Sequence, residues 1–503
     1  MTIKIDGRTL TINEIARVAR DDVAIELTKD AIRRVTECEA FLETLIDEGR
    51  PIYGVTTGFG ALDGRKVSRA DNHAQQVNLL KSHAAAYGPP MSRDTVRAMM
   101  VIRVNALATG QTGVHLATLE ALVAMLNAGI TPHVPLQGSV GACGDLAPLA
   151  HMALPLLGLG RARIGCSDWM DGAAVMQQAG IEPPHIAGRD GIALINGTEQ
   201  TSGIGALALH DASALIELAE EAACLTMEAL GAVSDSFDEL TALAKPHPGQ
   251  IATSANMRRL TKDSVSVLPP RPTRLRDALS LRCIPQVHGS TRDAIAHARE
   301  AMEMEINAVN DNPIFGVADN LVTSNSGNFH GQRIGEVLDY AANSITSLAV
   351  ISERRCARLV DENHNGGLPA FLIHPDAAQG RNNGMMIVQY TAASLVAEAR
   401  TRAVPGTIQS VPTCANTEDH VPMSPLAARR AGDVVDIAQT IVAIECLLAA
   451  QAMDLRGIDP APLLAPVYRT VRDAVPMMVE DRVLGDDLAA ARAAVTDYAQ
   501  TLH

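Results

Sequence analysis

Residues 137–151 read Gln-Gly-Ser-Val-Gly-Ala-Cys-Gly-Asp-Leu-Ala-Pro-Leu-Ala-His. Glycine recurs at every third position of this loop, at Gly138, Gly141 and Gly144, and an apolar run follows. Glycine lets the backbone turn sharply and approach itself closely. In such a loop the amide nitrogen of Gly144 can attack the carbonyl carbon of Ala142 and close a five-membered ring. Residue 143 then loses its side-chain heteroatom and keeps an exocyclic methylidene, an electrophile made only of protein atoms.

Two interpretations of this loop stay open from its residues alone. In the first, Ala142, Cys143 and Gly144 form the ring, because a thiol can leave as hydrogen sulfide where a hydroxyl leaves as water. In the second, Cys143 is an unreacted small side chain, since free cysteines are often buried. A helix predicted to begin at Leu146 would direct its N-terminal N–H groups at the loop, where they favour negative charge.

The composition indicates a soluble, helical protein. The 503-residue chain is rich in Ala and Leu and only 3% aromatic, which suits long packed helices better than a β-sandwich. Its net charge of -15 argues against a nucleic acid partner, because phosphate binding needs clustered Lys and Arg. No apolar run reaches the roughly 18 residues of a membrane span, and the first residues lack a signal-peptide pattern.

The cysteines give no sign of a metal or disulfide framework. All 8 are scattered, and no pair has the CxxC spacing of zinc or redox sites. We therefore expect no metal, and we expect the protein in the reducing cytoplasm.

Apolar periodicity and capping residues predict the helices. The long ones are expected at 198–230, 331–362, 385–402 and from Ser424 to a stop at Gly457. Shorter helices are expected from a cap at Ser92 to near Gly110, and at 114–127. Near the N-terminus, we expect a small hairpin around Asp6-Gly7 and a helix capped by Asn13.

Residues outside the loop are candidates for chemistry, and each has an ordinary alternative. Tyr53 opens Tyr-Gly-Val-Thr-Thr-Gly-Phe-Gly, whose glycines lack the dinucleotide-binding spacing, so no nucleotide is expected. Alone, it is a tyrosine at a loop edge. His83 is beside apolar residues and would ordinarily be a satisfied core side chain. Asn196 precedes a glycine, an ordinary turn signal, and Glu418 would ordinarily be a solvated loop carboxylate.

Together, these motifs resemble the histidine and aromatic amino-acid ammonia-lyases. The resemblance runs from the Tyr53 loop to Gly457 in matching order and spacing. It implies a mainly α-helical fold, the long-helix bundle of the ammonia-lyase (fumarase/aspartase-like) type, with small β content near the N-terminus. We expect residues 1–195 to form an active-site domain and residues 196–503 the bundle and C-terminal helices. The resemblance also implies a homotetramer whose active sites combine several subunits.

The resemblance assigns catalytic roles. In this family, an Ala-Ser-Gly at the loop becomes the cofactor methylidene-imidazolone (MIO), here implied to come from Ala142, Cys143 and Gly144. Tyr53 matches the family's tyrosine base, which needs a pKa below its usual ~10 to work as one. Glu418 matches the glutamate of histidine-specific members, where it hydrogen-bonds an imidazole or moves a proton.

The substrate-binding residues are assigned in the same way. His83 would contact the substrate imidazole, and Asn196 would lie beside the cofactor and the substrate carboxylate. Arg282 would pair with that carboxylate, a task suited to the fork of a guanidinium. Phe329, in Ser-Gly-Asn-Phe-His, would lie near the cofactor.

Three residues depart from the family pattern in this one pocket. Cys143 replaces the usual Ser, Leu279 stands where the family has a tyrosine, and Arg276 stands where histidine-specific members have glutamine. The first hypothesis is an MIO-dependent lyase that converts histidine, or a close analogue, to ammonia and urocanate or a similar acrylate. The second is MIO-independent release of an amine such as trimethylamine from a histidine betaine such as ergothioneine. A 2,3-aminomutase and a silent small-molecule-binding relative are the other hypotheses.

Overall fold

The computed structural model describes residues 2–378 and 380–502 and divides into two compact units. The first unit contains the chain up to His210 together with Ala298–Asp339 and Pro405–Arg429. The second contains Asp211–His297, Tyr340–Val404 and the chain from Arg430 onward. The predicted domain boundary after residue 195 stays a prediction.

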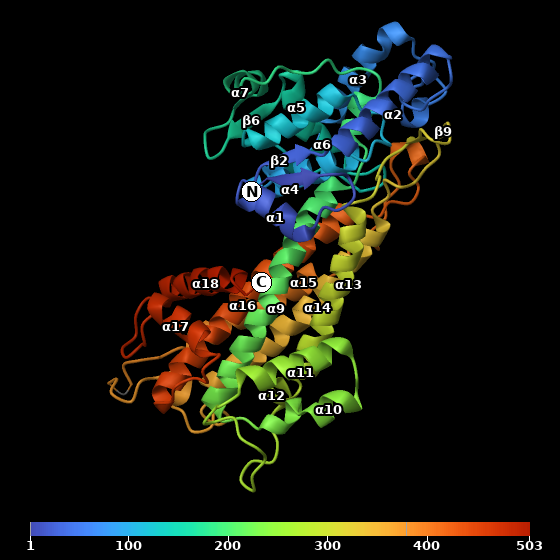
Figure 1. Ribbon diagram of the computed structural model, residues 1–503. Coiled ribbons are helices and arrows are strands. Elements are labelled where there is room, and N and C mark those ends of the chain that lie inside the picture. Colours follow the sequence, from blue (N-terminus) through green and yellow to red (C-terminus); the bar gives the residue numbers. More distant parts are fainter. Residues whose placement is uncertain (1, 379, 503) are drawn as a thin grey trace. The chain divides into compact units, whose positions relative to one another are not determined.

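The first unit holds short helices and all the strands of the described residues. Its helices are α1 (Ile12–Arg20), α2 (Lys29–Asp47), α3 (Arg69–His83), α4 (Arg93–Leu107), α5 (Leu116–Asn127), α6 (Leu146–Ala153), α7 (Gly172–Gln178) and α8 (Asp190–Ile195). Helix α4 packs between α1 and α5 (Figure 1). Helix α6 packs on α3 and α8. Because α6 begins directly after the glycine loop, this packing fixes one end of the loop.

The second unit is built on long helices, several of which begin or end in the first. The divided helices are α9 (Glu199–Leu230), α13 (Ile284–Glu305), α14 (Gln332–Val360) and α16 (Ser424–Arg456). The remaining helices are α10 (Glu239–Ala244), α11 (Pro248–Leu260), α12 (Leu279–Arg282), α15 (Met386–Arg402), α17 (Ala465–Ala474) and α18 (Leu484–Gln500). The predicted long helices are confirmed to within two residues at each end, and so is the mainly α, long-helix fold class.

Among the described residues, the strands are short and form four small sheets. They are β1 (Ile3–Ile5), β2 (Ile25–Leu27), β3 (Tyr87–Pro90), β4 (Ile130–Pro132), β5 (Pro135–Gln137), β6 (Arg161–Ile164), β7 (Met170–Asp171), β8 (Ile314–Gly316) and β9 (Leu321–Thr323). The pairs are β1 with β2, β3 with β5 and β8 with β9, and β6 lies between β4 and β7. The small β content is thus not confined to the N-terminus.

Two local predictions near the N-terminus are wrong. Strand β1 pairs in parallel with β2, so the turn at Asp6-Gly7 leads into a crossover rather than a hairpin. Helix α1 is capped by Thr11, not Asn13. The Thr11 side chain accepts the Glu14 N–H and the Glu14 carboxylate accepts the Thr11 N–H, which is a capping box.

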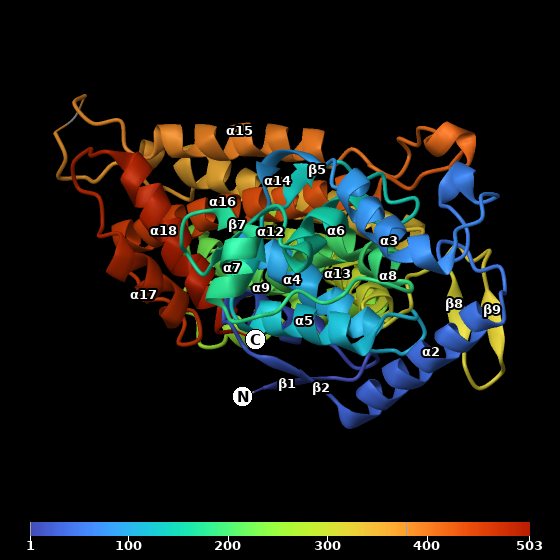
Figure 2. The ribbon, with the colours of Figure 1, turned by 90° about the horizontal axis from the view of Figure 1, so that it is seen from above.

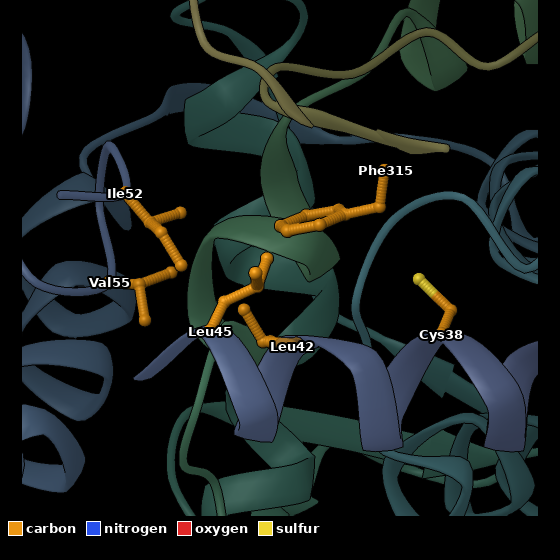
Figure 3. Close-up of a cluster of buried hydrophobic side chains, with 6 residues drawn as sticks. All are labelled: Cys38, Leu42, Leu45, Ile52, Val55 and Phe315. Carbon is orange, nitrogen blue, oxygen red and sulfur yellow. The ribbon is translucent and has the colours of Figure 1, made fainter. Parts of the chain in front are cut away.

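A hydrophobic cluster anchors the Tyr53 loop to the first unit. Helix α2 presents apolar side chains at helical spacing to the loop that follows it and to strand β8 (Figure 3). The members are Cys38, Leu42, Leu45, Ile52, Val55 and Phe315, each no more than 2% exposed. The β8–β9 hairpin accordingly lies beside α2 (Figure 2). Because Ile52 and Val55 flank Tyr53 in the chain, their burial holds the tyrosine's backbone.

Within the described residues, no helix combines the length and apolar character needed to cross a bilayer.

Candidate active site

The loop between β5 and α6 depends on glycine. Gly138, Gly141 and Gly144 all have positive φ, at 146°, 76° and 74°. A Cβ on Gly144 would lie 2.3 Å from the carbonyl oxygen of Gly197, far inside van der Waals contact. The backbone of the predicted ring-forming segment is therefore pressed against the turn that follows α8.

Ser139 and Asp145 fix the two ends of this segment. The Ser139 hydroxyl donates to Asp145 Oδ1 at 2.7 Å and accepts the Gly141 N–H at 3.0 Å. Asp145 Oδ2 accepts the Thr201 N–H at 2.8 Å, and burial raises the pKa of Asp145 to about 6. Sequence reasoning missed both residues as site elements, although a serine between the glycines and an aspartate at a helix start were available signals.

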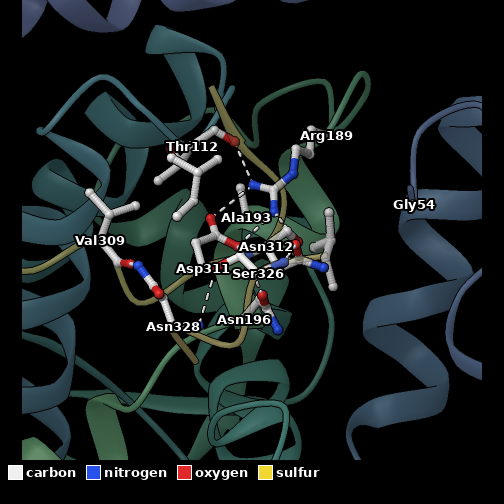
Figure 4. Close-up of polar contacts among 12 residues, drawn as sticks. Gly54, Thr112, Arg189, Ala193, Asn196, Val309, Asp311, Asn312, Ser326 and Asn328 are labelled. Atoms are coloured by element: carbon white, nitrogen blue, oxygen red, sulfur yellow. Dashed lines mark hydrogen bonds and ion pairs between the residues drawn. The ribbon is translucent and has the colours of Figure 1, made fainter. Parts of the chain in front are cut away.

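Asn196 contacts the loop directly. It follows α8, is 4% exposed, and donates from Nδ2 to the carbonyl oxygen of Cys143 at 2.9 Å. Its own Oδ1 accepts the N–H of Asn312 at 2.8 Å (Figure 4). The structure thus brings Asn196 to the predicted ring-forming segment, at the carbonyl that would become the ring carbonyl.

Cys143 and Glu418 lie together. Burial raises the pKa of the Cys143 thiol well above its usual value, and a hydrogen bond to the Glu418 carboxylate raises it further. The Thr413 hydroxyl donates a hydrogen bond to the same carboxylate. Thr413 was missed because no local pattern marks it, although its backbone pairs with that of Glu418 across a tight turn.

That turn also reaches the Tyr53 loop. Cys414, Ala415 and Asn416 have positive φ of 48°, 53° and 67°. The Cys414 Sγ lies 3.0 Å from where a Cβ on Gly60 would stand, and the Gly60 N–H donates to the Tyr53 hydroxyl at 2.8 Å. The two loops are therefore in contact beside Cys143.

The electrostatics of Tyr53 differ from what a base needs. Burial raises the pKa of its hydroxyl, and the neighbouring Cys143 and Cys414 sulfurs raise it further. The hydrogen bond from the Gly60 N–H acts in the opposite direction because it favours the phenolate. In this arrangement Tyr53 keeps its proton at neutral pH.

His83 ends helix α3 as a neutral imidazole. Its Nδ1 lies 2.9 Å from the Leu79 carbonyl oxygen, which can only accept, so Nδ1 carries the proton and Nε2 is an acceptor. Burial lowers the pKa of His83, while the nearby charge of Glu418 raises it. His83 and Glu418 therefore belong to one electrostatic neighbourhood.

The remaining predicted residues fall in different places. Phe329 is half-buried in the segment before α14, close to Gly331, whose N–H donates to the Gly141 carbonyl at 3.2 Å. Arg282 is exposed on α12 of the second unit, with Leu279, 62% exposed, at the start of that helix. Its role toward a substrate carboxylate stays a prediction, as does that of Arg276.

The residues present fit the cofactor that the loop motif implies. Ala142 and Gly144 are buried, the Gly144 backbone lies against Gly197, and Asn196 already holds the carbonyl of residue 143. Within the described residues, no group of three or more His, Cys, Asp or Glu side chains is arranged to hold a metal ion.

Comparison with known proteins supplies the family. A family model described as aromatic amino acid lyase matches residues 10–473. A histidine ammonia-lyase from Symbiobacterium thermophilum is 44% identical over 485 residues, 96% of this chain and 94% of that protein. The tyrosine aminomutase from Streptomyces globisporus superposes with a TM-score of 0.95 at 35% identity, covering 100% of this chain and 98% of the other.

A second solved relative is an enzyme that degrades ergothioneine. An ergothionase from Treponema denticola, in complex with desmethyl-ergothioneine sulfonic acid, superposes with a TM-score of 0.91 at 26% identity. The alignment covers 100% of this chain and 99% of that one. Since the family match spans nearly the whole chain, this protein belongs to the aromatic amino acid lyase family.

Proposed function

We propose that this protein is a carbon–nitrogen lyase that eliminates ammonia from L-histidine, or a close analogue, to give urocanate or a urocanate-like acrylate. The observation that carries the proposal is the hydrogen bond from Asn196 to the carbonyl of Cys143, inside a glycine loop closed on Gly197. The names of relatives at 44% identity support histidine as the substrate.

The loop would supply the electrophile. When Gly144 N adds to the Ala142 carbonyl carbon, one water is lost, and loss of hydrogen sulfide from Cys143 completes methylidene-imidazolone. Once formed, this group would supply an electrophile for the substrate amine, which would make the amine a better leaving group. Asn196 stabilises negative charge on the carbonyl oxygen of residue 143 by donating from Nδ2.

Other residues handle the substrate ring and the proton. His83 Nε2 accepts the imidazole N–H, and Glu418 accepts a second hydrogen bond or takes a proton. Tyr53 removes the β-proton as a phenolate stabilised by the Gly60 N–H. Because its pKa is raised, we expect turnover to increase as the pH rises above neutral.

The assembly and location belong to the same proposal. Arg282 would pair with the substrate carboxylate, and Phe329 would lie near the cofactor, in a homotetramer whose active sites combine several subunits. A small amino acid would be the only ligand besides the built-in cofactor, and the protein would work in the cytoplasm.

A second candidate is elimination of trimethylamine from a histidine betaine without the cofactor. Cys143 in place of serine and Leu279 in place of tyrosine favour it, because a quaternary amine leaves without an electrophile. The similarity to ergothionase is compatible with this alternative. A 2,3-aminomutase and a silent relative are weaker candidates, although an aminomutase is among the structural neighbours.

Intact mass, with peptide mapping of residues 138–150, separates the two. Loss of one water and one hydrogen sulfide from the encoded mass, with ammonia released from histidine, is the expected result. The Cys143→Ala variant is the control, because it has no leaving group at residue 143 and therefore cannot lose hydrogen sulfide or form the methylidene. The encoded mass with a titratable thiol, together with trimethylamine from the betaine, would replace the first function by the second.

A further inference from the structure

The amide of Asn196 has two possible orientations, and its surroundings allow only one. Its Oδ1 faces the N–H of Asn312 at 2.8 Å, and its Nδ2 faces the carbonyl oxygen of Cys143 at 2.9 Å. Rotating the amide by half a turn would set NH₂ against N–H and oxygen against oxygen, which loses both hydrogen bonds. The Asn312 N–H therefore decides where the Asn196 donor points.

The position of that N–H is set by a buried ion pair. Arg189 binds Asp311 in a two-pronged contact, Nη2 to Oδ1 at 2.6 Å and Nη1 to Oδ2 at 2.8 Å. Both side chains are no more than 1% exposed. Two parallel hydrogen bonds fix distance and angle together, which a single contact does not.

The same pair holds both main-chain polar groups of Asn312, its N–H and its carbonyl. Asp311 Oδ1 accepts the Asn312 N–H at 2.7 Å, and Arg189 Nη2 donates to the Asn312 carbonyl oxygen at 2.7 Å (Figure 4). The Asn312 side chain accepts the N–H of Ser326 at 2.9 Å, a third restraint. The Asn312 N–H, which donates to Asn196 Oδ1, is thus held in place.

Arg189 and Asn196 are the residues that bound the short helix α8. Arg189 is its N-cap and Asn196 its C-cap, and both reach the same segment, 310–312, more than a hundred residues away in sequence. A fully buried Arg103 also donates to the Asn196 main-chain oxygen at 3.1 Å. Neither end of α8 can shift without disturbing the other.

We propose that Arg189 and Asp311 are positioning residues that, through the main chain of Asn312 and its N–H, hold the Asn196 amide donor on the carbonyl of residue 143. Their catalytic consequence rests on the proposed function, since Asn196 stabilises charge on that carbonyl in the reaction. Their structural consequence, an ordered loop at residues 139–146, does not depend on the proposed function.

A double-mutant cycle on turnover tests the proposal. Asp311→Asn is expected to lower kcat by about 10- to 100-fold with a smaller change in KM, because it misdirects a donor used in the reaction. Combined with Asn196→Ala, it is expected to add nothing, because its effect passes through the lost side chain. Multiplying losses in the double variant would overturn the proposal.

Asp339→Asn is the matched control. Asp339 is also a buried carboxylate of the first unit, 6% exposed, but it accepts from Gly406 and Thr407. We expect kcat within about twofold of wild type for this variant. Should Asp311→Asn not fold, Arg189→Lys replaces it in the cycle, since lysine keeps a cation but loses the two-pronged contact.

Hydrogen exchange separates this proposal from the proposed function. The peptide covering residues 139–146 is expected to exchange faster in Asp311→Asn and in Asn196→Ala, equally in the double variant, and unchanged in Asp339→Asn. If the wild type releases no amine from histidine or a betaine, the function fails and exchange alone decides the positioning. Unchanged exchange in Asp311→Asn would overturn the positioning even in an active enzyme.

Discussion

Each unit contains a fully buried arginine–carboxylate pair, and the two pairs differ in the groups to which they are further hydrogen-bonded. In the second unit Arg355 binds Glu445, both 0% exposed. Each oxygen of Glu445 also accepts a hydroxyl, from Thr226 at 2.8 Å and from Ser352 at 2.7 Å. In the first unit, Arg189 and Asp311 are hydrogen-bonded to the main-chain carbonyl and N–H of Asn312. The same N–H donates to Asn196.

The difference follows from secondary structure. Glu445, Thr226 and Ser352 are all in helix interiors, whose main-chain groups are already paired, so the hydrogen bonds to the Glu445 carboxylate come from side chains. Asn312 lies outside the helices, and its main-chain N–H and carbonyl are free to take part. A buried ion pair thus braces packed helices in one unit and orients a loop in the other.

Gly144→Ala changes the glycine loop of the first unit and is expected to have the largest effect, a loss of turnover. A Cβ 2.3 Å from the Gly197 oxygen must displace residue 143 from Asn196, so we expect kcat to fall on the order of 10³-fold and the encoded mass to persist. Gly165→Ala is the control, because φ is +56° there but no atom lies within 4 Å of the added Cβ. Equal turnover in the two variants would contradict the role of the close approach.

Glu445→Ala tests whether the Arg355–Glu445 pair stabilises the packed helices of the second unit. It leaves the Arg355 guanidinium buried without its carboxylate, which is expected to lower the free energy of unfolding by roughly 3–5 kcal/mol. The measurement is urea unfolding followed by circular dichroism. Hydrogen exchange of residues 139–146 should not change under native conditions. Faster exchange there would mean that the second network also governs the loop.

The long helices could be predicted from the sequence because their signals are local. Ser424 and Pro425 mark the start of α16, and apolar periodicity carries it to Arg456, next to the predicted stop at Gly457. The partner of β1 could not be found in this way, since β2 follows only after α1. Pairing across an intervening helix leaves no local pattern.

In the candidate site, too, features with a local sequence pattern could be predicted, and contacts between distant residues could not. The glycine loop, Tyr53 and Asn196 stand in recognisable motifs, and the structure brings Asn196 and Cys143 together. The Arg189–Asp311 pair joins residues separated by 122 positions, and no local pattern predicts that these two residues pair. The raised pKa of Tyr53 was equally hidden, because it comes mainly from burial that only the folded chain creates.

His115 tests whether charge in the first unit also carries stability. Its hydrogen bond to Asp190, at 2.8 Å, raises its pKa to about 9, against ~6.5 in an unfolded chain. The folded state thus binds a proton more tightly, so this stabilisation is full below about pH 6.5 and is lost as the pH rises through about 9. We expect His115→Gln to cost on the order of 3 kcal/mol near pH 6 and much less near pH 9.5.

Urea unfolding of wild type and variant at both pH values measures this effect. His364→Gln is the control, because His364 pairs with Asp361 on the surface, where the two side chains are 59% and 41% exposed. Water screens that pair, so little change is expected at either pH. A cost of His115→Gln that does not vary with pH would point to lost packing rather than lost charge.

Arg402→Ala has the smallest expected effect and sets the scale for the buried pairs. Arg402 reaches Asp433 at 2.9 Å and Glu398 at 3.3 Å in the second unit, but all three side chains are 46–51% exposed. Solvent screening and the entropy of ordering long side chains offset the attraction, so we expect a loss of about 0–1 kcal/mol in urea unfolding. A loss comparable to that of Glu445→Ala would mean that charge pairing, and not burial, makes the second unit's network strong. A small loss would mean that burial is what makes the Arg355–Glu445 and Arg189–Asp311 pairs strong. The two pairs would then differ in their further partners, which are side chains of packed helices for the first and the main chain of Asn312 for the second.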